Sequence, residues 1–276
     1  MLQKHPTRII MLCFILVASG AVAWWIFRDP AGAFTVSVPG MDKRVKGAAI
    51  PGKPVVIGAD FKFFKNSPDV PGTRWTNFRG EDYDNISKEN IKLIDQWGPG
   101  GPRILWKMSL GEGHAAPAVY DGKVYILDYN ETDKSDQLRC LLLNTGEELW
   151  RRGYRVHLKR NHGLSRTIPA VNAKAVLTIG PKCQVMCVNR ENGDFMWGID
   201  LVTEYDTEIP FWYTGQCPLL DGDTAIVATG GKALLIAIDC NTGKKIWETP
   251  NPRGWKMSHS SVMPATIAGK KMYVYM

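Results

Sequence analysis

NTGEELW occupies residues 144–150, and two related stretches follow it, ENGDFMW at 191–197 and NTGKKIW at 241–247. Each contains a glycine, three intervening residues and a tryptophan. A glycine adopts the backbone conformations that a tight turn needs, and the tryptophan then begins a strand. We expect the indole to cover a seam between neighbouring units, because a single sheet must bury its apolar face against another element. These positions are therefore predicted to be structural: Gly146, Trp150, Gly193, Trp197, Gly243 and Trp247.

A second marker, a proline, recurs with nearly the same period as the tryptophan. Counted from Trp106, successive tryptophans of the series are separated by 44, 47 and 50 residues. A proline opens a β-rich run in each unit, and these prolines are separated by 52, 49 and 46 residues. They are Pro117, Pro169, Pro218 and Pro264. Two markers with one period indicate an internal repeat, and periods of this size are typical of stacked or radial arrays.

Each unit is predicted to contain four short strands. In the first unit we expect a strand at 103–110, a hairpin around Asp121-Gly122 and a strand at 137–144, after which the NTG turn leads into the next unit. Four strands in roughly 45 residues are typical of a β-propeller blade, and a β-sandwich would not explain the regular tryptophans. The fold class is therefore all-β. About three and a half blades are present, so we expect an incomplete ring, belonging either to a fragment of a longer protein, which we favour, or to a ring that a partner completes.

The N-terminal region has a different character. Residues 9–27 are apolar or small and follow basic residues, which predicts a transmembrane signal anchor behind a cytoplasmic tail at 1–8. A cleaved signal peptide is the alternative, with Ala21-Val22-Ala23 as its site. Residues 28–74 are rich in Pro, Gly and Lys and are predicted to be a linker, which leaves 75–276 as the repeat domain. Both readings export the repeat domain to the bacterial periplasm or cell surface.

Charge and cysteine content exclude some classes of function. The formal net charge is +7, but residues 75–276 hold 24 Lys and Arg against 23 Asp and Glu. A nearly neutral body argues against a nucleic-acid partner. The six cysteines show no C-x-x-C spacing, so no zinc or redox motif is indicated. One or two disulfides are compatible with an oxidising compartment, but the sequence does not assign the pairs.

The stretch AIDCNTGKKIW at 237–247 resembles the tryptophan-docking motif of pyrroloquinoline-quinone-like propeller repeats. The segments 75–87 and 100–128 resemble the start of the repeat region in bacterial exported members of that family. The resemblance implies the propeller fold. Dehydrogenases of the family use a stacking tryptophan, a disulfide of adjacent cysteines, calcium and a catalytic aspartate. This chain has no adjacent cysteines and no calcium-loop pattern, so neither a cofactor, a metal site nor catalytic residues are predicted; pyrroloquinoline quinone with calcium belongs to the alternative below.

The connections that precede each proline vary most and carry the candidate binding residues. If the repeats are in register, their side chains approach one rim of the ring, where convergent polar and aromatic groups suit a ligand or a peptide. The rim candidates are His114, His162, Arg166, Tyr213, Gln216 and His259. Our first hypothesis is a membrane-anchored, non-catalytic scaffold that binds a protein or polymer partner in the cell envelope, by analogy with the propeller lipoprotein of the outer-membrane assembly machine. The alternative is a quinoprotein that oxidises an alcohol or a sugar.

Overall fold

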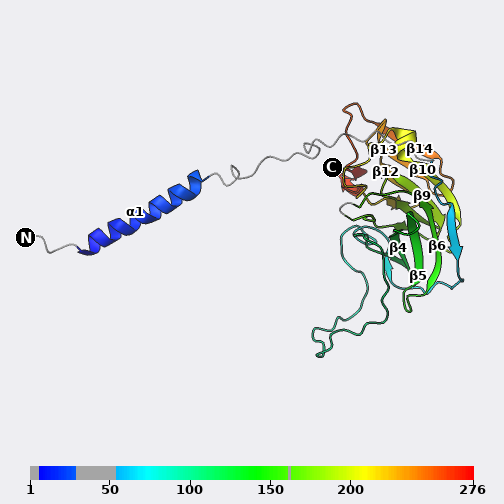
Figure 1. The fold of residues 1–276 in the computed structure, drawn as a ribbon, viewed down its shortest axis with the longest axis horizontal. Helices are drawn as coiled ribbons and strands as arrows, with labels where there is room; N and C mark the ends of the chain where they lie inside the picture. Colours follow the sequence, from blue (N-terminus) through cyan, green and yellow to red (C-terminus); the bar gives the residue numbers. More distant parts are fainter. Residues whose placement is uncertain (1–5, 29–53, 161–162) are drawn as a thin grey trace, which may run out of the picture. The chain divides into compact units, whose positions relative to one another are not determined.

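The computed structural model describes residues 6–28, 54–160 and 163–276. The chain divides into two compact units, Met1–Gly52 and Lys53–Met276. What is described of the first unit is one helix, α1 (Pro6–Phe27), drawn in blue in Figure 1. Its stretch Ile9–Phe27 has a mean hydropathy of 2.4, which is long and apolar enough to cross a membrane. A signal sequence would meet the same criteria.

The second unit is built from antiparallel sheets that follow one another along the chain (Figure 1). The first sheet contains β3 (Ala118–Tyr120), β4 (Lys123–Asn130), β5 (Ser135–Leu142) and β6 (Glu148–Arg155). The second contains β7 (Ala170–Val171), β8 (Ala175–Ile179), β9 (Gln184–Asn189) and β10 (Phe195–Asp200), and the short helix α2 (Leu201–Tyr205) follows it. The third contains β11 (Leu219–Asp221), β12 (Thr224–Ala228), β13 (Ala233–Asp239) and β14 (Lys245–Pro250). A hairpin of β15 (Met263–Ile267) and β16 (Lys270–Val274) comes last. The predicted incomplete ring of four-stranded blades is confirmed, because the described strands form three such sheets and one hairpin.

The predicted hairpin at Asp121-Gly122 is confirmed. Tyr120 pairs with Lys123, so the connection has two residues. Their φ angles are 43° and 81°. Positive φ at both positions matches the right-handed twist of the flanking strands.

The phase of the strands differs from the prediction. The turn at Gly146 joins β5 and β6 within one sheet, where Cys140 pairs with Trp150, and so does not lead into the next blade. The same arrangement recurs where Cys187 pairs with Trp197. A turn this short returns the chain beside the strand it has just left, which makes the tryptophan strand the fourth strand of the same blade. The connections between blades are the longer ones that end at the prolines.

Residues 103–110 are not a strand, contrary to the prediction. No strand of the described chain pairs with them, and a β-rich composition without a backbone partner does not make a ladder. They are held by a side chain instead, since Trp106 Nε1 donates to the Leu143 carbonyl oxygen at 2.7 Å.

Residues 54–86, which we call the strap, correct the predicted domain boundary. Residues 28–74 were expected to be a linker, but the described residues from 54 onward belong to the compact unit that contains the sheets. Within the strap, β1 (Asp60–Phe63) pairs with β6 and β2 (Arg74–Trp75) pairs with β3, so the strap adds a strand to each edge of the first sheet. Farther along, Tyr83 Oη donates to the Leu220 carbonyl oxygen in the third sheet. The part of the predicted linker at 29–53 lies outside the described residues.

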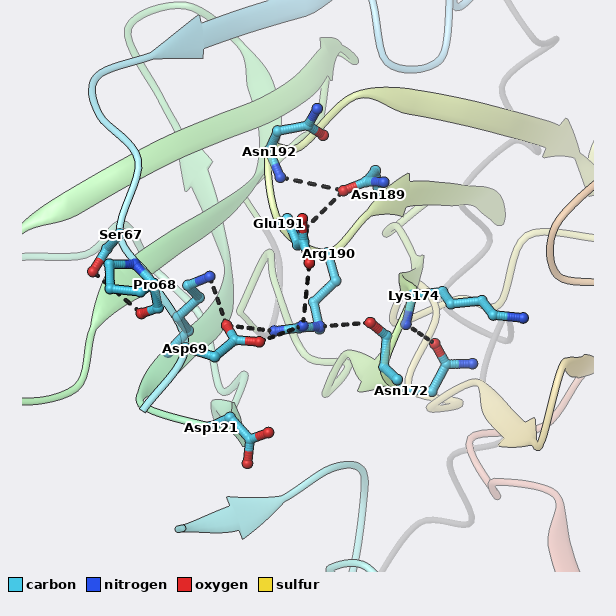
Figure 2. A network of polar contacts seen from close by, with 12 residues as sticks. Ser67, Pro68, Asp69, Asp121, Asn172, Lys174, Asn189, Arg190, Glu191 and Asn192 are labelled. Carbon is cyan, nitrogen blue, oxygen red and sulfur yellow. Dashed lines mark hydrogen bonds and ion pairs between the residues drawn. The ribbon is translucent and has the colours of Figure 1, made fainter. Parts of the chain in front are cut away.

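An ion cluster joins the strap to the first two sheets. Asp69 accepts hydrogen bonds from Lys123 at 2.8 Å and from Arg190 at 3.0 and 2.6 Å. The Lys123 and Arg190 side chains are only 3% and 4% exposed. Figure 2 shows the Arg190 guanidinium reaching toward Asp69 from the turn after β9. The hydrogen bonds from Arg190, and then those from Lys123, hold the pKa of Asp69 well below its usual range. The carboxylate therefore stays charged and bridges two blades.

The tryptophans pack on the glycine turns of the following repeat. A Cβ atom on Gly146 would lie 2.6 Å from the Trp106 ring, and one on Gly193 would lie 2.6 Å from the Trp150 ring. On Gly243 it would lie 2.7 Å from Trp197. The Trp150 and Trp197 indoles thus lie between successive blades, and Trp106 packs on the turn of the first blade. Trp247 stacks on Tyr273 with ring centroids 6.0 Å apart.

Candidate functional site: the rim loops

Four connections each lead into the first strand of a sheet or of the final hairpin, namely β3, β7, β11 and β15. These connections are residues 111–117, 156–160 with 163–169, 206–218 and 251–262, and we call them the rim. Their backbones bond to one another rather than only to their own blades. Gly113 forms a parallel bridge with Ser165, and the His114 amide donates to the Ser165 carbonyl oxygen at 2.6 Å. The first two connections are therefore one continuous layer.

His114 and Arg166 meet at one glycine. A Cβ atom on Gly163 would lie 2.6 Å from His114 Cδ2, so the imidazole sits directly on this turn. Arg166 Nε donates to the Gly163 carbonyl oxygen at 3.2 Å. Partial burial lowers the pKa of Arg166. These two predicted candidates are close together, with the histidine ring exposed and the arginine half-buried.

Tyr213 and His259 form a second group. Tyr213 Oη donates to the Lys159 carbonyl oxygen and accepts from the Lys159 amide, each at 2.9 Å. Nε2 of His259 lies 2.9 Å from the Tyr213 carbonyl oxygen. Tyr213 is buried, and that burial raises its pKa. Tyr213 therefore works as a tie between three connections, and the imidazole of His259 is what remains exposed.

Gln216 does not approach the rim surface, which corrects its place among the candidates. Its side chain is fully buried. Nε2 donates to the Ala228 carbonyl oxygen, and Oε1 accepts from the Ala228 amide. The side-chain amide makes the two hydrogen bonds to Ala228 that the backbone of a neighbouring strand would make, and it so extends the edge of the third sheet. His162, the remaining candidate, lies outside the described residues.

Exposed aromatic side chains are the feature that sequence reasoning mostly missed. Phe211, Trp212 and Trp255 are 48%, 40% and 52% exposed. Phe211 and Trp212 contact each other edge to face, with ring centroids 4.6 Å apart. Arg253 lies over the Trp255 ring at 5.3 Å. The run of three aromatic residues at 211–213, inside a connection rich in turn residues, was the signal that could have placed them, because loop aromatics have no strand face to cover.

Ion pairs join neighbouring connections of the rim. Lys256 and Glu208 form an ion pair at 2.6 Å between two connections. Arg160 and Glu112 form another at 2.6 Å. Lys182 lies near Lys159, and its burial, followed by the charge of Lys159, lowers the pKa of Lys182. Exposed aromatic residues are enriched in protein interfaces, whose margins are polar.

The described residues do not fit the cofactor that quinoprotein dehydrogenases of this fold use. Across residues 6–28, 54–160 and 163–276, no group of three or more His, Cys, Asp or Glu side chains is placed to hold a metal ion. Hard cations such as calcium need several such oxygen ligands. One part of each of the Trp106, Trp150 and Trp197 rings lies against a glycine turn.

Repeated four-stranded antiparallel blades, sealed by tryptophans at each seam, define this chain as a β-propeller protein. A family model described as "Outer membrane protein assembly factor BamB" matches residues 96–197 and 134–275. The matches together span more than half of the chain, and the chain belongs to this family of pyrroloquinoline-quinone-like propeller repeats. No curated protein matches it.

Several solved structures are similar to part of the chain. A europium-containing methanol dehydrogenase is 15% identical with a TM-score of 0.43, over 63% of this chain and 31% of its own length. A quinohemoprotein alcohol dehydrogenase from Comamonas testosteroni is 16% identical with a TM-score of 0.44, over 63% and 27%. BamB from Moraxella catarrhalis is 18% identical with a TM-score of 0.33, over 51% and 36%. The chain thus spans about a third of the length of these structures.

Proposed function

We propose that the protein is a membrane-anchored, exported propeller that holds a protein or polymer partner on its rim and performs no catalysis itself. The observation that carries the proposal is the rim: its connections are bonded to one another, and they leave Phe211, Trp212 and Trp255 exposed. Exposed aromatic residues on a firm support contribute much of the binding energy in protein interfaces.

Two further observations support this function. The matching family model describes an assembly factor, a role that rests on binding. The helix α1 is long and apolar enough to hold the chain at a membrane. The body carries almost no net charge, so partner recognition would rest on contact area at the rim more than on long-range attraction.

Site-specific photocrosslinking tests the proposal. A photoreactive phenylalanine replaces Trp255 in the full chain, and in a matched chain it replaces Trp97, which is 63% exposed but lies outside the rim. We expect discrete adducts in the cell envelope from position 255, reduced several-fold when Trp212 is changed to Ala, and none from position 97. Equal labelling from both positions would contradict a rim interface. Dye-linked oxidation of an alcohol or sugar by the full-length protein with pyrroloquinoline quinone and Ca²⁺ would overturn the non-catalytic role.

A further inference from the structure

Two buried thiols face each other across the seam between the second and third sheets. Cys187 lies on β9 and Cys240 directly follows β13, and they are 0% and 1% exposed. Their Sγ atoms are 3.7 Å apart. The Cys187 thiol also lies 3.6 Å from the Cys240 carbonyl oxygen, the same oxygen that accepts the Trp197 indole at 2.7 Å. The thiol pair therefore sits under the tryptophan that seals this seam.

The repeat itself creates this meeting. Two equivalent positions meet at each seam. One lies opposite the tryptophan in the sheet of that tryptophan. The other lies in the next blade, three residues before the glycine on which the tryptophan packs. At the first seam these positions hold Cys140 and Arg190, and Arg190 turns away to bind Asp69. At the second seam they hold Cys187 and Cys240. The strap's carboxylate ties the first seam, and only thiols occupy the matching place at the second.

The other cysteines of the propeller have different neighbours. Cys183 contacts Thr214 Oγ1 at 3.3 Å and Met257 Sδ at 3.9 Å. Cys217 accepts a hydrogen bond from the Ile168 amide at 3.2 Å. A disulfide requires sulfur atoms at about 2 Å, and among the described cysteines the 3.7 Å contact is the one sulfur–sulfur approach between thiols. We propose that Cys187 and Cys240 form a disulfide that locks the second blade to the third under oxidising conditions.

The chemistry is a thiol–disulfide exchange with a small or protein disulfide as the oxidant. One cysteine thiolate attacks the oxidant and releases its first thiol. The second cysteine then attacks the mixed disulfide, which forms the Cys187–Cys240 bond and releases the second thiol. The two cysteines lose two protons and two electrons in total, and the oxidant's disulfide takes up both electrons. Both thiols are buried once the seam is closed, so an oxidant cannot reach them there, and we expect the exchange to occur while the seam is still open during folding.

Refolding the full chain in detergent with oxidised and reduced glutathione tests the inference without assuming export. Free thiols are alkylated, and the protein is digested with trypsin without reduction. We expect a linked species of peptides 183–190 and 233–244. Because the first peptide contains both Cys183 and Cys187, fragmentation must place the bond at Cys187. Cys183→Ser is the matched control and keeps the link, whereas Cys187→Ser loses it.

Thermal unfolding supplies a second measurement. Dithiothreitol should lower the unfolding midpoint of the refolded wild type and of Cys183→Ser by roughly 5–10 °C. It should leave Cys187→Ser and Cys240→Ser unchanged. Six alkylated thiols in the refolded wild type would overturn the inference, and so would a bond located at Cys183, Cys140 or Cys217.

Discussion

Gly193 meets two separate demands at one position. Its φ angle of 74° lies in the left-handed region, where side chains are strained. The Trp150 ring also covers the place that a Cβ atom would take. The recurring glycine and tryptophan predicted a tight turn and an indole over a seam between units. The sequence did not show that the ring lies on the following repeat's turn, which only the paired strands reveal.

Replacing Gly193 with Ala separates the two demands when Gly222→Ala is the control. Gly222 also has a positive φ, of 61°, but nothing lies within 4 Å of its missing Cβ atom. We expect Gly222→Ala to lower the free energy of unfolding by about 1 kcal/mol through backbone strain alone. Gly193→Ala should lower it by about 1–3 kcal/mol more, because the methyl group must displace the indole. Urea unfolding followed by tryptophan fluorescence measures both; equal losses would show that the ring contact contributes nothing.

Asp136 is a buried carboxyl group between the first two blades. Tyr154 Oη donates to it at 3.1 Å and Ser165 Oγ at 3.4 Å. Burial raises its pKa from 3.8 to about 7. As the pH rises from about 4 to about 7, the unfolded chain ionises this group while the folded chain keeps it protonated. The free energy of unfolding should therefore fall over this range, by at most on the order of 4 kcal/mol, and the loss is complete above the folded pKa.

The variant Asp136→Asn should remove that fall. The neutral amide imitates the protonated acid, so the variant should be more stable than the wild type at pH 8 and nearly equal to it at pH 4. Asp133→Asn, at an exposed position in the preceding turn, should keep the wild-type profile. Urea unfolding between pH 4 and 8 gives the comparison, and parallel profiles for all three proteins would place the pH dependence elsewhere.

At the scale of elements, the strap shows why local composition misled the domain boundary. Its prolines, glycines and lysines predict a linker, because such residues form few regular elements on their own. Its order comes from distant partners: Phe63 pairs with Trp150, and Arg74 pairs with Tyr120. The same argument applies to residues 103–110, whose β-rich composition finds no partner strand. A sequence pattern predicts what a segment can become, and the available partner decides whether it does.

The strap's ion cluster should contribute far more to the free energy of unfolding than an exposed ion pair does. Asp69→Asn leaves Lys123 and Arg190 buried without a counter-charge, which we expect to cost about 3 kcal/mol in unfolding free energy. Asp223→Asn removes the Lys174–Asp223 pair, 59% and 51% exposed, and should change little. Urea unfolding and limited proteolysis of the strap provide the measurements. Similar stability of the two variants would mean that β1 and β2 hold the strap without the cluster.

For the whole molecule, the sequence predicted more of the architecture than of the site. Repeats are visible in a sequence through their period, so the type of blade and the number of blades present could be predicted from that period. Rim residues have no such period. Gln216 is polar and lies in a variable connection, yet its amide completes a strand edge, while Phe211 and Trp255 are apolar and exposed. Which loop residues turn inward depends on contacts between blades, and the sequence does not encode those as a pattern.

The role of α1 can be tested on the full chain. We expect the protein to stay in the membrane fraction after an alkaline carbonate wash and to keep its original N-terminus, because residues 9–27 match the thickness of a bilayer. Leu16→Arg, which places a charge near the middle of the helix, should release it, and Leu16→Ile should not. A washed-off product whose N-terminus follows Ala23 would instead identify α1 as a cleaved signal.

The strap also imposes an order on the folding of the chain during its synthesis. A chain is synthesised from its N-terminus, so Asp69 exists 121 residues before the arginine that it binds. The separation is larger for Tyr83, which donates a hydrogen bond to a carbonyl group 137 residues further along the chain. During translation β1 and β2 can pair with the first sheet as soon as that sheet has been made. The contacts from Asp69 and Tyr83 can form only after the second and third blades have been made, so attachment of the strap is completed only in a nascent chain that already contains those blades.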